Sequence, residues 1–285
     1  MNAPFPTQPE RTLALAPEYA DTAPDAGAGE RARIREGIRK GEFSLAYQPI
    51  VDVRSGMAVG AEALLRWRHP ERGWLQPGSF EQILHDPGVS WDITAFVLDR
   101  IFTDLAALPD EERRGFVSFN VYPSQLRGGR LKELVETRYL ARGGAPESLV
   151  IELLESEPHV TCDELIVNVQ ALRALGLRVA IDDLGCGAWT LADLMHLKVD
   201  VVKLARELIC QIPSSDAAMT IVAGTLRILD ALGTQVIAEG VETDEQIAWV
   251  ATDPKLWAQG YAFSRAQPDL ASAIGWTHPA ACAHV

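Results

Sequence analysis

The sequence has no long run of basic residues. Its 26 lysine and arginine residues are outnumbered by 39 aspartate and glutamate residues, which gives a formal net charge of −13. Duplex binding needs cationic side chains that displace counterions from the phosphates, so DNA is not expected as a partner. The same negative charge would repel a small anionic substrate unless metal ions or local arginine and lysine residues offset it.

The sequence is also poor in cysteine and in long apolar segments. Its four cysteines form no CxxC pair, and no cluster of cysteine and histidine has the spacing of a zinc site. This usage is typical of a reduced chain in the cytoplasm. The N-terminus lacks a basic region followed by an apolar core, and no apolar stretch approaches the ~20 residues that span a bilayer. We therefore expect a cytoplasmic protein without a membrane segment.

The composition of the remaining chain favours one large folded domain. Apolar residues make up 47% of the 285 residues, which is enough for a large core. Residues 1–29 are rich in alanine, proline, threonine and glycine without useful periodicity, and they predict a flexible tail. Helical periodicity follows, with Ile34 and Ile38 four residues apart. We predict one domain over residues 30–275 and a C-terminal tail at residues 276–285.

Short apolar runs alternate with helical stretches through this domain. Several runs are almost continuously apolar, as in parallel strands that are covered on both faces. Helical stretches lie between most of them, for example at residues 93–108, 162–176 and 218–233. The last two end at Gly176 and Gly233, which suit helix C-caps. The predicted strands occupy residues 43–51, 57–67, 116–121, 149–154, 177–183, 200–204, 234–239 and 258–263.

The number and order of these elements predict the fold class. Eight strands with alternating helices are typical of an α/β protein with a (β/α)8 TIM-like barrel, which often reaches ~250 residues as one unit. The first two strands are joined only by the segment DVRSG, which is too short for a helical crossover. We therefore expect one antiparallel strand in the barrel.

Acidic and amide side chains recur where the apolar runs end. The carboxyl ends of barrel strands meet at one rim, and oxygen ligands gathered there could hold hard divalent cations against a phosphate. The pattern therefore predicts one metal-dependent site. The residues at these strand ends are Glu62, Asn120, Glu152, Asp182, Asp183 and Glu239, with Lys203 at a further strand end.

Most of these residues also have a plainer interpretation. Asp182 and Asp183 could cap the next helix or form an Asx turn, although at a strand end both carboxylates can reach one rim. Glu152 would be costly to bury unpaired, which favours metal ligation or a salt bridge. Asn120 could be a turn residue. Lys203 could neutralise a nearby acid, or it could orient or deprotonate a metal-bound water.

The order of these residues resembles the EAL domain family, the cyclic di-GMP phosphodiesterase module of bacteria. The resemblance covers about residues 31–275, with matching order and spacing and no large gap. The matching motifs are QPI at 48–50, EALLRW at 62–67, SFNVYPSQL around Asn120, IELLE with Glu152 and Glu155, DDLG at 182–185, VDVVK ending at Lys203, EGVET at 239–243 and QGY at 259–261.

The resemblance implies a two-metal site that opens one phosphodiester of cyclic di-GMP to give linear pGpG. Two Mg²⁺ or Mn²⁺ ions suit the oxygen ligands. One ion would be held by Glu62, Asn120, Glu152 and Asp182, and the other by Asp182, Asp183 and Glu239. Lys203 would position or activate the attacking water, and Glu62, Glu155 and Glu239 would share in catalysis. Substrate contacts would come from Gln48, Leu64, Arg66, Asn120 and Gln259.

The sequence departs from the family pattern in four segments. DDLGCGAWTL replaces DDFGTGYSSL, which the family uses for dimerisation and for support of the metal site. The family motif KID reads Lys203, Leu204, Ala205 here, LHDPG replaces AEETG at Leu84–Gly88, and GYAFSRAQP replaces GYLFGRP. All the expected ligands are nevertheless present. Loss of outer partners of a metal site can lower metal affinity or rate by ~10–100-fold.

We therefore expect an active, metal-dependent cyclic di-GMP phosphodiesterase. The alternative is a catalytically weak or inactive EAL domain that acts as a cyclic di-GMP receptor or as a protein-interaction module. The resemblance also implies a homodimer. Because no sensor domain accompanies the predicted domain, a protein partner in trans could regulate it.

Overall fold

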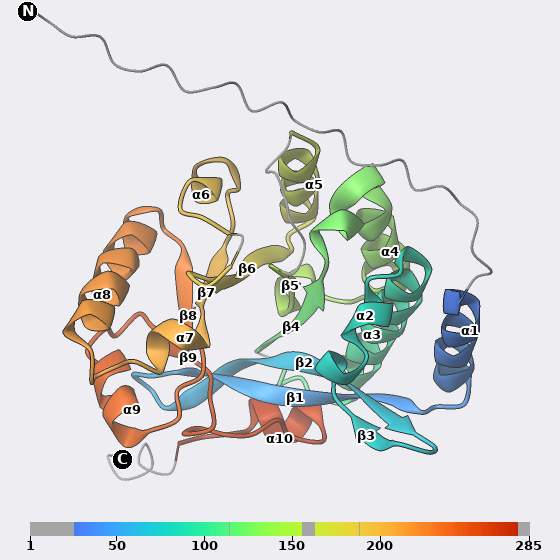
Figure 1. Ribbon diagram of the computed structural model, residues 1–285, viewed down its shortest axis with the longest axis horizontal. Helices are drawn as coiled ribbons and strands as arrows, with labels where there is room; N and C mark the ends of the chain where they lie inside the picture. The colour runs from blue at the N-terminus through green and yellow to red at the C-terminus, as the bar shows by residue number, and fades with distance from the viewer. Residues whose placement is uncertain (1–25, 114, 156–162, 188, 279–285) are drawn as a thin grey trace, which may run out of the picture.

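The computed structural model describes residues 26–113, 115–155, 163–187 and 189–278. Within these residues, eight strands close into a barrel in the order β1-β9-β8-β7-β6-β5-β4-β2, and β1 pairs with β2 to complete it (Figure 1). The predicted α/β barrel is therefore confirmed. The barrel strands are β1 (Phe43–Asp52), β2 (Met57–His69), β4 (Phe116–Val121), β5 (Leu149–Leu153), β6 (Arg178–Leu184), β7 (Val201–Leu204), β8 (Gln235–Ala238) and β9 (Trp257–Ala258).

β1 is the reversed strand that the short DVRSG connection predicts. It runs antiparallel to β2 and β9, whereas β2 pairs with β4 in parallel and the parallel pairing continues round to β9. A short additional strand, β3 (Gly73–Leu75), pairs antiparallel with the end of β2 and was not expected from the sequence. The β1–β2 register places Gln48 directly opposite Glu62.

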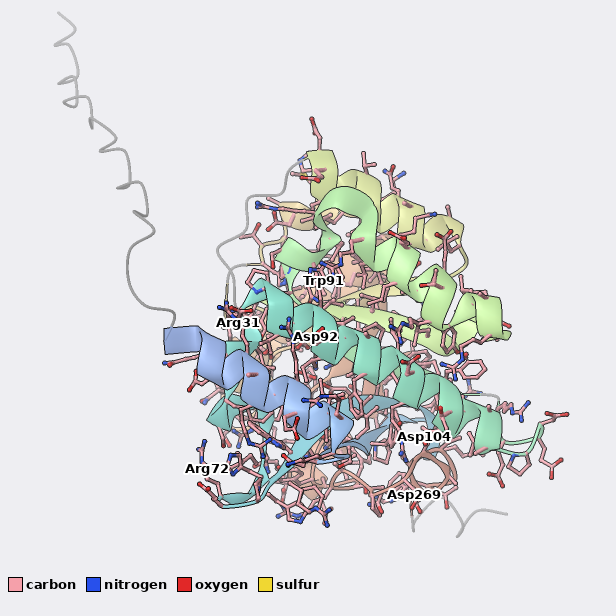
Figure 2. All side chains as sticks on the ribbon, turned by 90° about the vertical axis from the view of Figure 1, so that its right-hand side faces the viewer. Arg31, Arg72, Trp91, Asp92, Asp104 and Asp269 are labelled. Carbon is pink, nitrogen blue, oxygen red and sulfur yellow. The ribbon has the colours of Figure 1, made fainter. Side chains whose placement is uncertain are left out.

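Helices cover the outside of the barrel (Figure 1). Figure 2 shows α1 lying along α3, where Arg31 pairs with Asp86 at 2.7 Å and Arg35 pairs with Asp92 at 2.5 Å. The helices are α1 (Ala26–Arg39), α2 (Glu81–Leu84), α3 (Pro87–Ala107), α4 (Arg130–Arg138), α5 (Asp163–Ala174), α6 (Asp193–His196), α7 (Arg206–Ile209), α8 (Asp216–Ala231), α9 (Asp244–Val250) and α10 (Leu270–Ile274). Short 3₁₀ turns are η1 (Pro77–Ser79), η2 (Pro123–Gly129), η3 (Leu140–Arg142) and η4 (Pro146–Ser148).

The long helices agree with the predicted stretches, with one difference at the start of α3. This helix begins six residues before the predicted stretch because the segment LHDPG supplies a strong start signal. The Asp86 side chain accepts hydrogen bonds from the backbone N–H groups of Gly88 and Val89, and Pro87 occupies the first turn. Gly176 and Gly233 follow α5 and α8 with φ angles of 90° and 71°, as expected of residues that end helices.

The prediction of a strand over residues 258–263 is wrong beyond its first residue. β9 ends at Ala258, and the chain then turns, with the Phe263 N–H donating to the Gly260 carbonyl at 3.1 Å. A Cβ at residue 260 would lie 2.1 Å from the carbonyl oxygen of Val241. The glycine therefore marks a close approach of two backbones, which an apolar run in a single sequence does not reveal.

The interior of the barrel changes from apolar to polar along the strands. Alternate residues of a strand share a face, so two side chains that are two positions apart can both point into the barrel. On β5 this places Glu152 two residues beyond Val150, and on β7 it places Lys203 beyond Val201. An apolar floor therefore lies directly below the polar rim. The floor is a buried cluster of Ile50, Phe116, Val150, Ala180, Val201 and Ile237.

The predicted domain boundaries lie close to the first and last residues that the structure describes. Residues 1–25 of the predicted N-terminal tail and residues 279–285 of the predicted C-terminal tail lie outside the described residues. Thr277 pairs with Met57, and the His278 N–H donates to the Gly56 carbonyl at 2.7 Å. The domain boundaries themselves stay predictions. Among the described helices, none has both the length and the apolar character needed to cross a bilayer.

Candidate active site at the barrel rim

Lys203 lies at the centre of a ring of carboxylates inside the barrel. Its Nζ atom is 2.6 Å from Glu239 Oε1, 2.9 Å from Glu152 Oε2, 3.0 Å from Asp182 Oδ1 and 3.2 Å from Glu62 Oε2. The side chain is only 1% exposed. Strands that are far apart in the sequence therefore bring their charged side chains together around one buried ammonium group. Glu62 comes from the middle of β2 and not from a strand end as the sequence predicts, because β2 continues to His69.

The ring determines the protonation state of Lys203. Burial alone lowers the pKa of a lysine, but the carboxylates of Asp182, Glu152, Glu239 and Glu62 outweigh burial and hold the pKa of Lys203 well above its usual range. The amine is therefore a protonated hydrogen-bond donor in this arrangement. It cannot accept a proton from water while these four carboxylates surround it.

Burial has the opposite effect on the carboxylates, because it raises the pKa of an acid. Burial and mutual repulsion raise the pKa of Glu152 to about 8 and that of Asp182 to about 6, and they hold the pKa of Glu239 well above its ordinary value. Burial also acts on Glu62, but Lys203 and the amides of Gln259 and Asn120 overcome it and lower the pKa of Glu62. The site carries more negative charge than one ammonium group can offset.

Asp182 and Asp183 face the same site because the end of β6 is distorted. The β6–β7 register shifts between Ile181 and Leu184, and Asp183 has a φ angle of 52°, in the left-handed region. This backbone turn brings neighbouring carboxylates, which would alternate on a regular strand, to one side. Oxygens of Asp182, Asp183 and Glu239 lie within 4.8 Å of one another.

Buried oxygens that could bind a cation lie around the ring. The oxygens Asn120 Oδ1, Glu152 Oε1 and Gln259 Oε1 are buried without a hydrogen-bond partner. The amide nitrogens of Asn120 and Gln259 each donate to Glu62 at 2.9 Å, which leaves their oxygens free to bind a cation. Buried acceptors without donors are uncommon, and hard divalent ions prefer such oxygen ligands.

The charge count agrees with two divalent ions. Five carboxylates and the Lys203 ammonium leave four formal negative charges, which two divalent cations would balance. The residues therefore fit the two-metal site that the resemblance implies. The five carboxylates are Glu62, Glu152, Asp182, Asp183 and Glu239.

The predicted substrate residues lie beside this ring. Gln48 is opposite Glu62 in the register, and Leu64 and Arg66 follow Glu62 on the same face of β2. The Gln48 amide donates to the Ser264 carbonyl at 3.1 Å, and Arg66 is half-buried and donates to the Leu65 carbonyl at 2.9 Å. These side chains therefore extend the polar face of the ring along the β1–β2 hairpin.

A cavity of about 310 Å³ opens beside the ring and includes residues that sequence reasoning missed. Gln48, Glu62, Glu239 and Gln259 line it together with Arg206, Glu242 and Tyr261. Arg206 pairs with Glu242 at 2.9 Å. The missed residues come two or three positions after Lys203, Glu239 and Gln259. The signal that could have found them is that residues directly after a strand end must build the rim.

A second cavity, of about 250 Å³, adjoins the other predicted substrate residues. Leu64 and Asn120 line it with the apolar side chains of Ile93 and Val97 and with the polar side chain of Thr94. Its lining is mainly apolar with a few polar groups, which is typical of a site for a flat organic ring. The two cavities together place both polar and apolar surfaces beside the carboxylates.

Glu155 lies under the loop that follows β6 and not in the carboxylate ring. Its carboxylate packs against Gly187 so closely that a Cβ there would lie 1.5 Å from Glu155 Oε2. That oxygen is buried without a hydrogen-bond partner, and burial, together with Asp182 and Glu207, raises the pKa of Glu155. The structure therefore places Glu155 where it supports the loop.

Ala205, where the family motif has an acid, lies outside the ring as well. It is the N-cap residue of α7 and makes no side-chain capping bond. An acidic residue at an N-cap stabilises the start of a helix. The missing acid therefore removes a helix cap and leaves the carboxylates around Lys203 complete.

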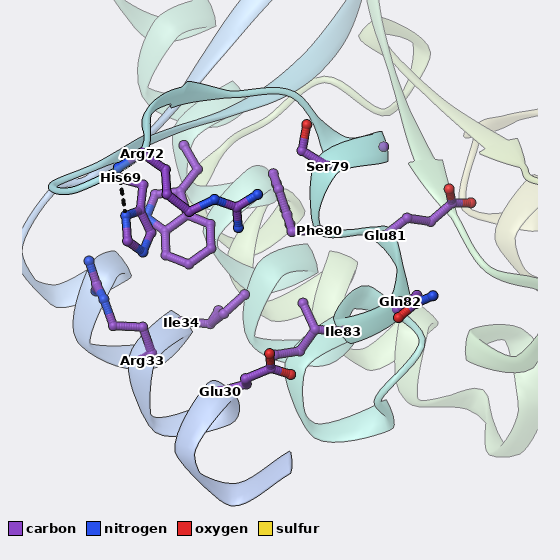
Figure 3. Close-up of a pocket in the computed structure, with 12 residues that line it drawn as sticks. Glu30, Arg33, Ile34, His69, Arg72, Ser79, Phe80, Glu81, Gln82 and Ile83 are labelled. Atoms are coloured by element: carbon purple, nitrogen blue, oxygen red, sulfur yellow. Dashed lines mark hydrogen bonds between the residues drawn. The ribbon is translucent and has the colours of Figure 1, made fainter. Parts of the chain in front are cut away.

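A larger cavity, of about 500 Å³, lies on the outer side of the barrel between α1 and the β2–β3 hairpin (Figure 3). Arg33, Arg72 and His69 surround the apolar side chains of Ile34 and Phe80 there (Figure 3). The His69 ring accepts two backbone hydrogen bonds at 3.2 Å and so stabilises the hairpin turn. None of the carboxylates of the ring lines this cavity, which separates it from the candidate active site.

The fold and the ring together define an α/β-barrel protein with an acidic cluster, near the carboxyl ends of its strands, that could bind metal. The sequence model of the EAL domain family matches residues 31–266. The chain belongs to the EAL domain family.

Relatives and solved structures support this assignment. The chain is 34% identical to the cyclic di-GMP phosphodiesterase NbdA of Pseudomonas aeruginosa over 236 residues, which are 82% of this chain and 30% of that protein. It is 36% identical to an uncharacterized protein of Mycobacterium tuberculosis over 241 residues, 82% of this chain and 78% of that protein. An uncharacterized signaling protein of Caulobacter vibrioides is 34% identical over 235 residues. That match covers 82% of this chain and 29% of the Caulobacter protein, so the chain spans under a third of such longer relatives.

Two solved structures have the same fold with bound nucleotide. The PaMucR phosphodiesterase in complex with c-di-GMP aligns with a TM-score of 0.76 and 27% identity, over 84% of this chain and 98% of that chain. The EAL enzyme Bd1971, bound to cAMP and cyclic-di-GMP, aligns with a TM-score of 0.79 and 25% identity, over 87% of this chain and 69% of that chain.

Proposed function

We propose that this chain is a metal-dependent phosphodiesterase that hydrolyses cyclic di-GMP to linear pGpG. The observation that carries the proposal is the convergence of five carboxylates from separate parts of the chain on one site with unpaired buried oxygens. The activity named for NbdA and the nucleotide bound to PaMucR support the choice of substrate. A cytoplasmic location and a homodimer remain part of the proposal.

The proposed metal ligands divide into two sets that share Asp182. Mg²⁺ and Mn²⁺ both suit a site made only of oxygen ligands. Bound divalent ions would neutralise the phosphodiester and lower the pKa of the attacking water. One set is Glu62, Asn120, Glu152 and Asp182, and the other is Asp182, Asp183 and Glu239.

Lys203 would act as a donor in this site. Its ammonium reaches the ligands on four sides, so it can hold them in place and donate a hydrogen bond to the attacking water. Its high pKa argues against its use as the base in the arrangement described. Gln259 donates to Glu62, which Lys203 also contacts, so Gln259 and Lys203 would together orient the Glu62 carboxylate. Glu155 would act indirectly, by supporting the loop that follows Asp183.

The two cavities beside the ring suit the parts of a cyclic dinucleotide. The mainly apolar cavity next to Leu64 and Asn120 would take one base. Gln48 and Arg206, which line the polar cavity, would contact the phosphate and sugar of the other half. Arg66 and Arg206 also offset the overall negative charge locally, which an anionic substrate requires.

The test is hydrolysis of cyclic di-GMP by the wild-type protein with Mg²⁺, with Mn²⁺ and with EDTA. Asp182→Asn removes the shared ligand charge, and turnover should fall by more than ~100-fold. Asp200→Asn is the matched control, because Asp200 pairs with Arg173 at 2.7 Å away from the ring. The control should keep its turnover. A wild-type protein that binds metal and nucleotide without forming pGpG would overturn the proposed activity.

A cyclic di-GMP receptor with little catalysis is the second candidate function. The altered loop after Asp183 favours it, because this loop adjoins the proposed ligands and differs from the family pattern. Calorimetry would then show nucleotide binding while chromatography shows no linear product. Rapid cleavage by the wild-type protein would rule this candidate out. A role as a protein-interaction module, with a partner in trans, ranks last because all the proposed ligands are present.

A further inference from the structure

The loop between β6 and α6 is held to the barrel by one buried indole. Trp189 is 3% exposed, and its Nε1–H donates to the Leu153 carbonyl at 3.3 Å. The β5–β6 pairing ends at Leu153 and Ile181. The indole therefore continues the connection between the two strands past the point where their backbone pairing stops.

Both ends of this connection adjoin proposed metal ligands. Leu153 directly follows Glu152 on β5, and the loop that carries Trp189 begins after Leu184, the residue that follows Asp182 and Asp183 on β6. A movement of the loop would therefore shift the carboxylates of β6 relative to the carboxylate of β5. The indole bond limits that movement.

The part of the loop that precedes the indole contains two glycines, while the part that follows it is closed by hydrogen bonds from Thr190 to Asp193. Gly185 has a φ angle of 111°, and Gly187 leaves room for the Glu155 carboxylate, so two positions that glycine makes flexible precede the indole. Glu155 Oε2 gains no hydrogen bond in return for its burial. The packing of Trp189 in the core is therefore a stabilising contact that keeps the loop over Glu155.

We propose that Trp189 is a positioning residue that sets the distance between the ligands on β5 and those on β6. This inference rests on the proposed function, because it assigns those ligands to divalent ions. The family motif quoted above has serine at this position, so the tether is a property of this chain. It would replace support that the changed residues of the loop no longer give.

The test is a calorimetric titration of Mn²⁺ into the nucleotide-free protein, compared with the Trp189→Phe variant. Phenylalanine keeps an aromatic side chain in the core but cannot donate to Leu153. Because outer partners of metal sites act at the level of ~10-fold in affinity, we expect Mn²⁺ binding to weaken by about that factor. Turnover should recover at saturating Mn²⁺, which a general loss of stability would not produce.

Trp67→Phe is the matched control. Trp67 is also buried and donates its indole N–H, to Glu42 at 3.0 Å, on the outer side of β2. Both variants lose one indole hydrogen bond and should lose similar thermal stability, but only Trp189→Phe should bind Mn²⁺ less tightly. Equal Mn²⁺ affinity in wild type and Trp189→Phe overturns the inference.

Two further outcomes separate this inference from the proposed function. If the wild-type protein binds no Mn²⁺, the proposed metal site fails. If Trp189→Phe does not fold, hydrogen exchange on the wild-type protein tests whether the loop is held in place. The amide of Cys186 should then be protected in the metal-free protein, because the tether holds the loop in place. Unprotected exchange at that amide overturns the inference.

Discussion

The floor and the rim of the barrel interior are built on the same strands and differ in almost every physical property. The floor is a closed apolar cluster in which Phe116 stacks on Trp257 with ring centroids 5.5 Å apart. The rim, which lies two residues further along β5, β6, β7 and β8, gathers carboxylates around Lys203. The floor stabilises the fold by burying apolar surface, whereas the rim buries charge at a cost that only its partners offset.

This difference indicates how the fold tolerates the site. A buried carboxylate is costly unless cations or donors surround it, and here each carboxylate of the ring shares one ammonium group. The apolar floor supplies the stability that keeps these repelling groups together. The two regions should therefore respond differently to mutation, pH and metal ions.

The largest effect is expected from the floor. Phe116→Ala removes the contact with Trp257 and the contact with Arg178, whose guanidinium lies 4.5 Å from the ring centroid. Truncation of a buried phenylalanine costs about 3–5 kcal/mol in the free energy of unfolding, to be measured by denaturant unfolding. The folded variant should bind Mn²⁺ as tightly as wild type. Weakened Mn²⁺ binding in the folded variant would show that floor and rim are not separable.

A smaller loss of stability is expected from the centre of the rim. Lys203→Met leaves four carboxylates without their ammonium partner, and loss of one partner of a buried ion pair costs about 3 kcal/mol. Uptake of protons by the carboxylates should reduce the loss at low pH. Metal ions should raise the melting temperature of this variant by more than that of wild type.

Lys255→Met provides the matched control for Lys203→Met. Lys255 pairs with Asp230 at 2.5 Å, but both side chains are exposed, so the change should cost less than about 1 kcal/mol. Equal losses of stability in the two variants would contradict the interpretation of the ring as a buried charge cluster.

Because of the carboxylates at the rim, the stabilisation of the fold by metal ions should also depend on pH. The pKa values of about 8 for Glu152 and about 6 for Asp182 exceed the values of roughly 4 in an unfolded chain. A raised folded pKa contributes stability below the unfolded pKa, and that contribution is lost as pH rises through the folded pKa. The metal-free protein should therefore lose stability as the pH rises towards 8.

Metal ions reverse this loss, because they bind the ionised carboxylates. The rise in melting temperature caused by Mg²⁺ should grow between pH 5.5 and pH 8. Melting curves recorded with Mg²⁺ and with EDTA across that range measure it. A rise that is constant with pH would mean that these carboxylates are already ionised in the metal-free protein.

The smallest effect is expected at the edge of the rim. Arg206 is largely exposed and pairs with Glu242, so Arg206→Gln should leave the fold and the metal ions undisturbed. If Arg206 contacts the substrate, KM should rise by about 5-fold with little change in kcat, since a single exposed charged contact is worth about 1 kcal/mol. Steady-state kinetics would show it, and an unchanged KM would remove Arg206 from the proposed substrate site.

Much of this site could be predicted from strand ends alone. An acid after an apolar run, as in Glu152 or Glu239, is hard to explain by burial unless it has a partner, and barrel topology brings such ends together. The short connection before β2 was sufficient to predict the antiparallel strand, because no helix fits in it. Local chemistry and chain length therefore determined the fold class and the candidate ligands.

Other features depended on contacts between distant segments. The apolar run after Ala258 is a turn because Gly260 meets the backbone of Val241. Asp183 shares a site with Asp182 because the end of β6 departs from regular pairing. Lys203 is a protonated donor because four carboxylates on or next to four other strands surround it.

The sequence by itself determined which residues could bind metal and where along the chain the strands end, because these follow from side-chain chemistry and periodicity. Only the tertiary structure decided how the charges compensate one another and that Trp189 ties the β6 loop to β5. The physical reason is that pKa values and tethers depend on distances between residues far apart in the chain, and the closed barrel determines those distances.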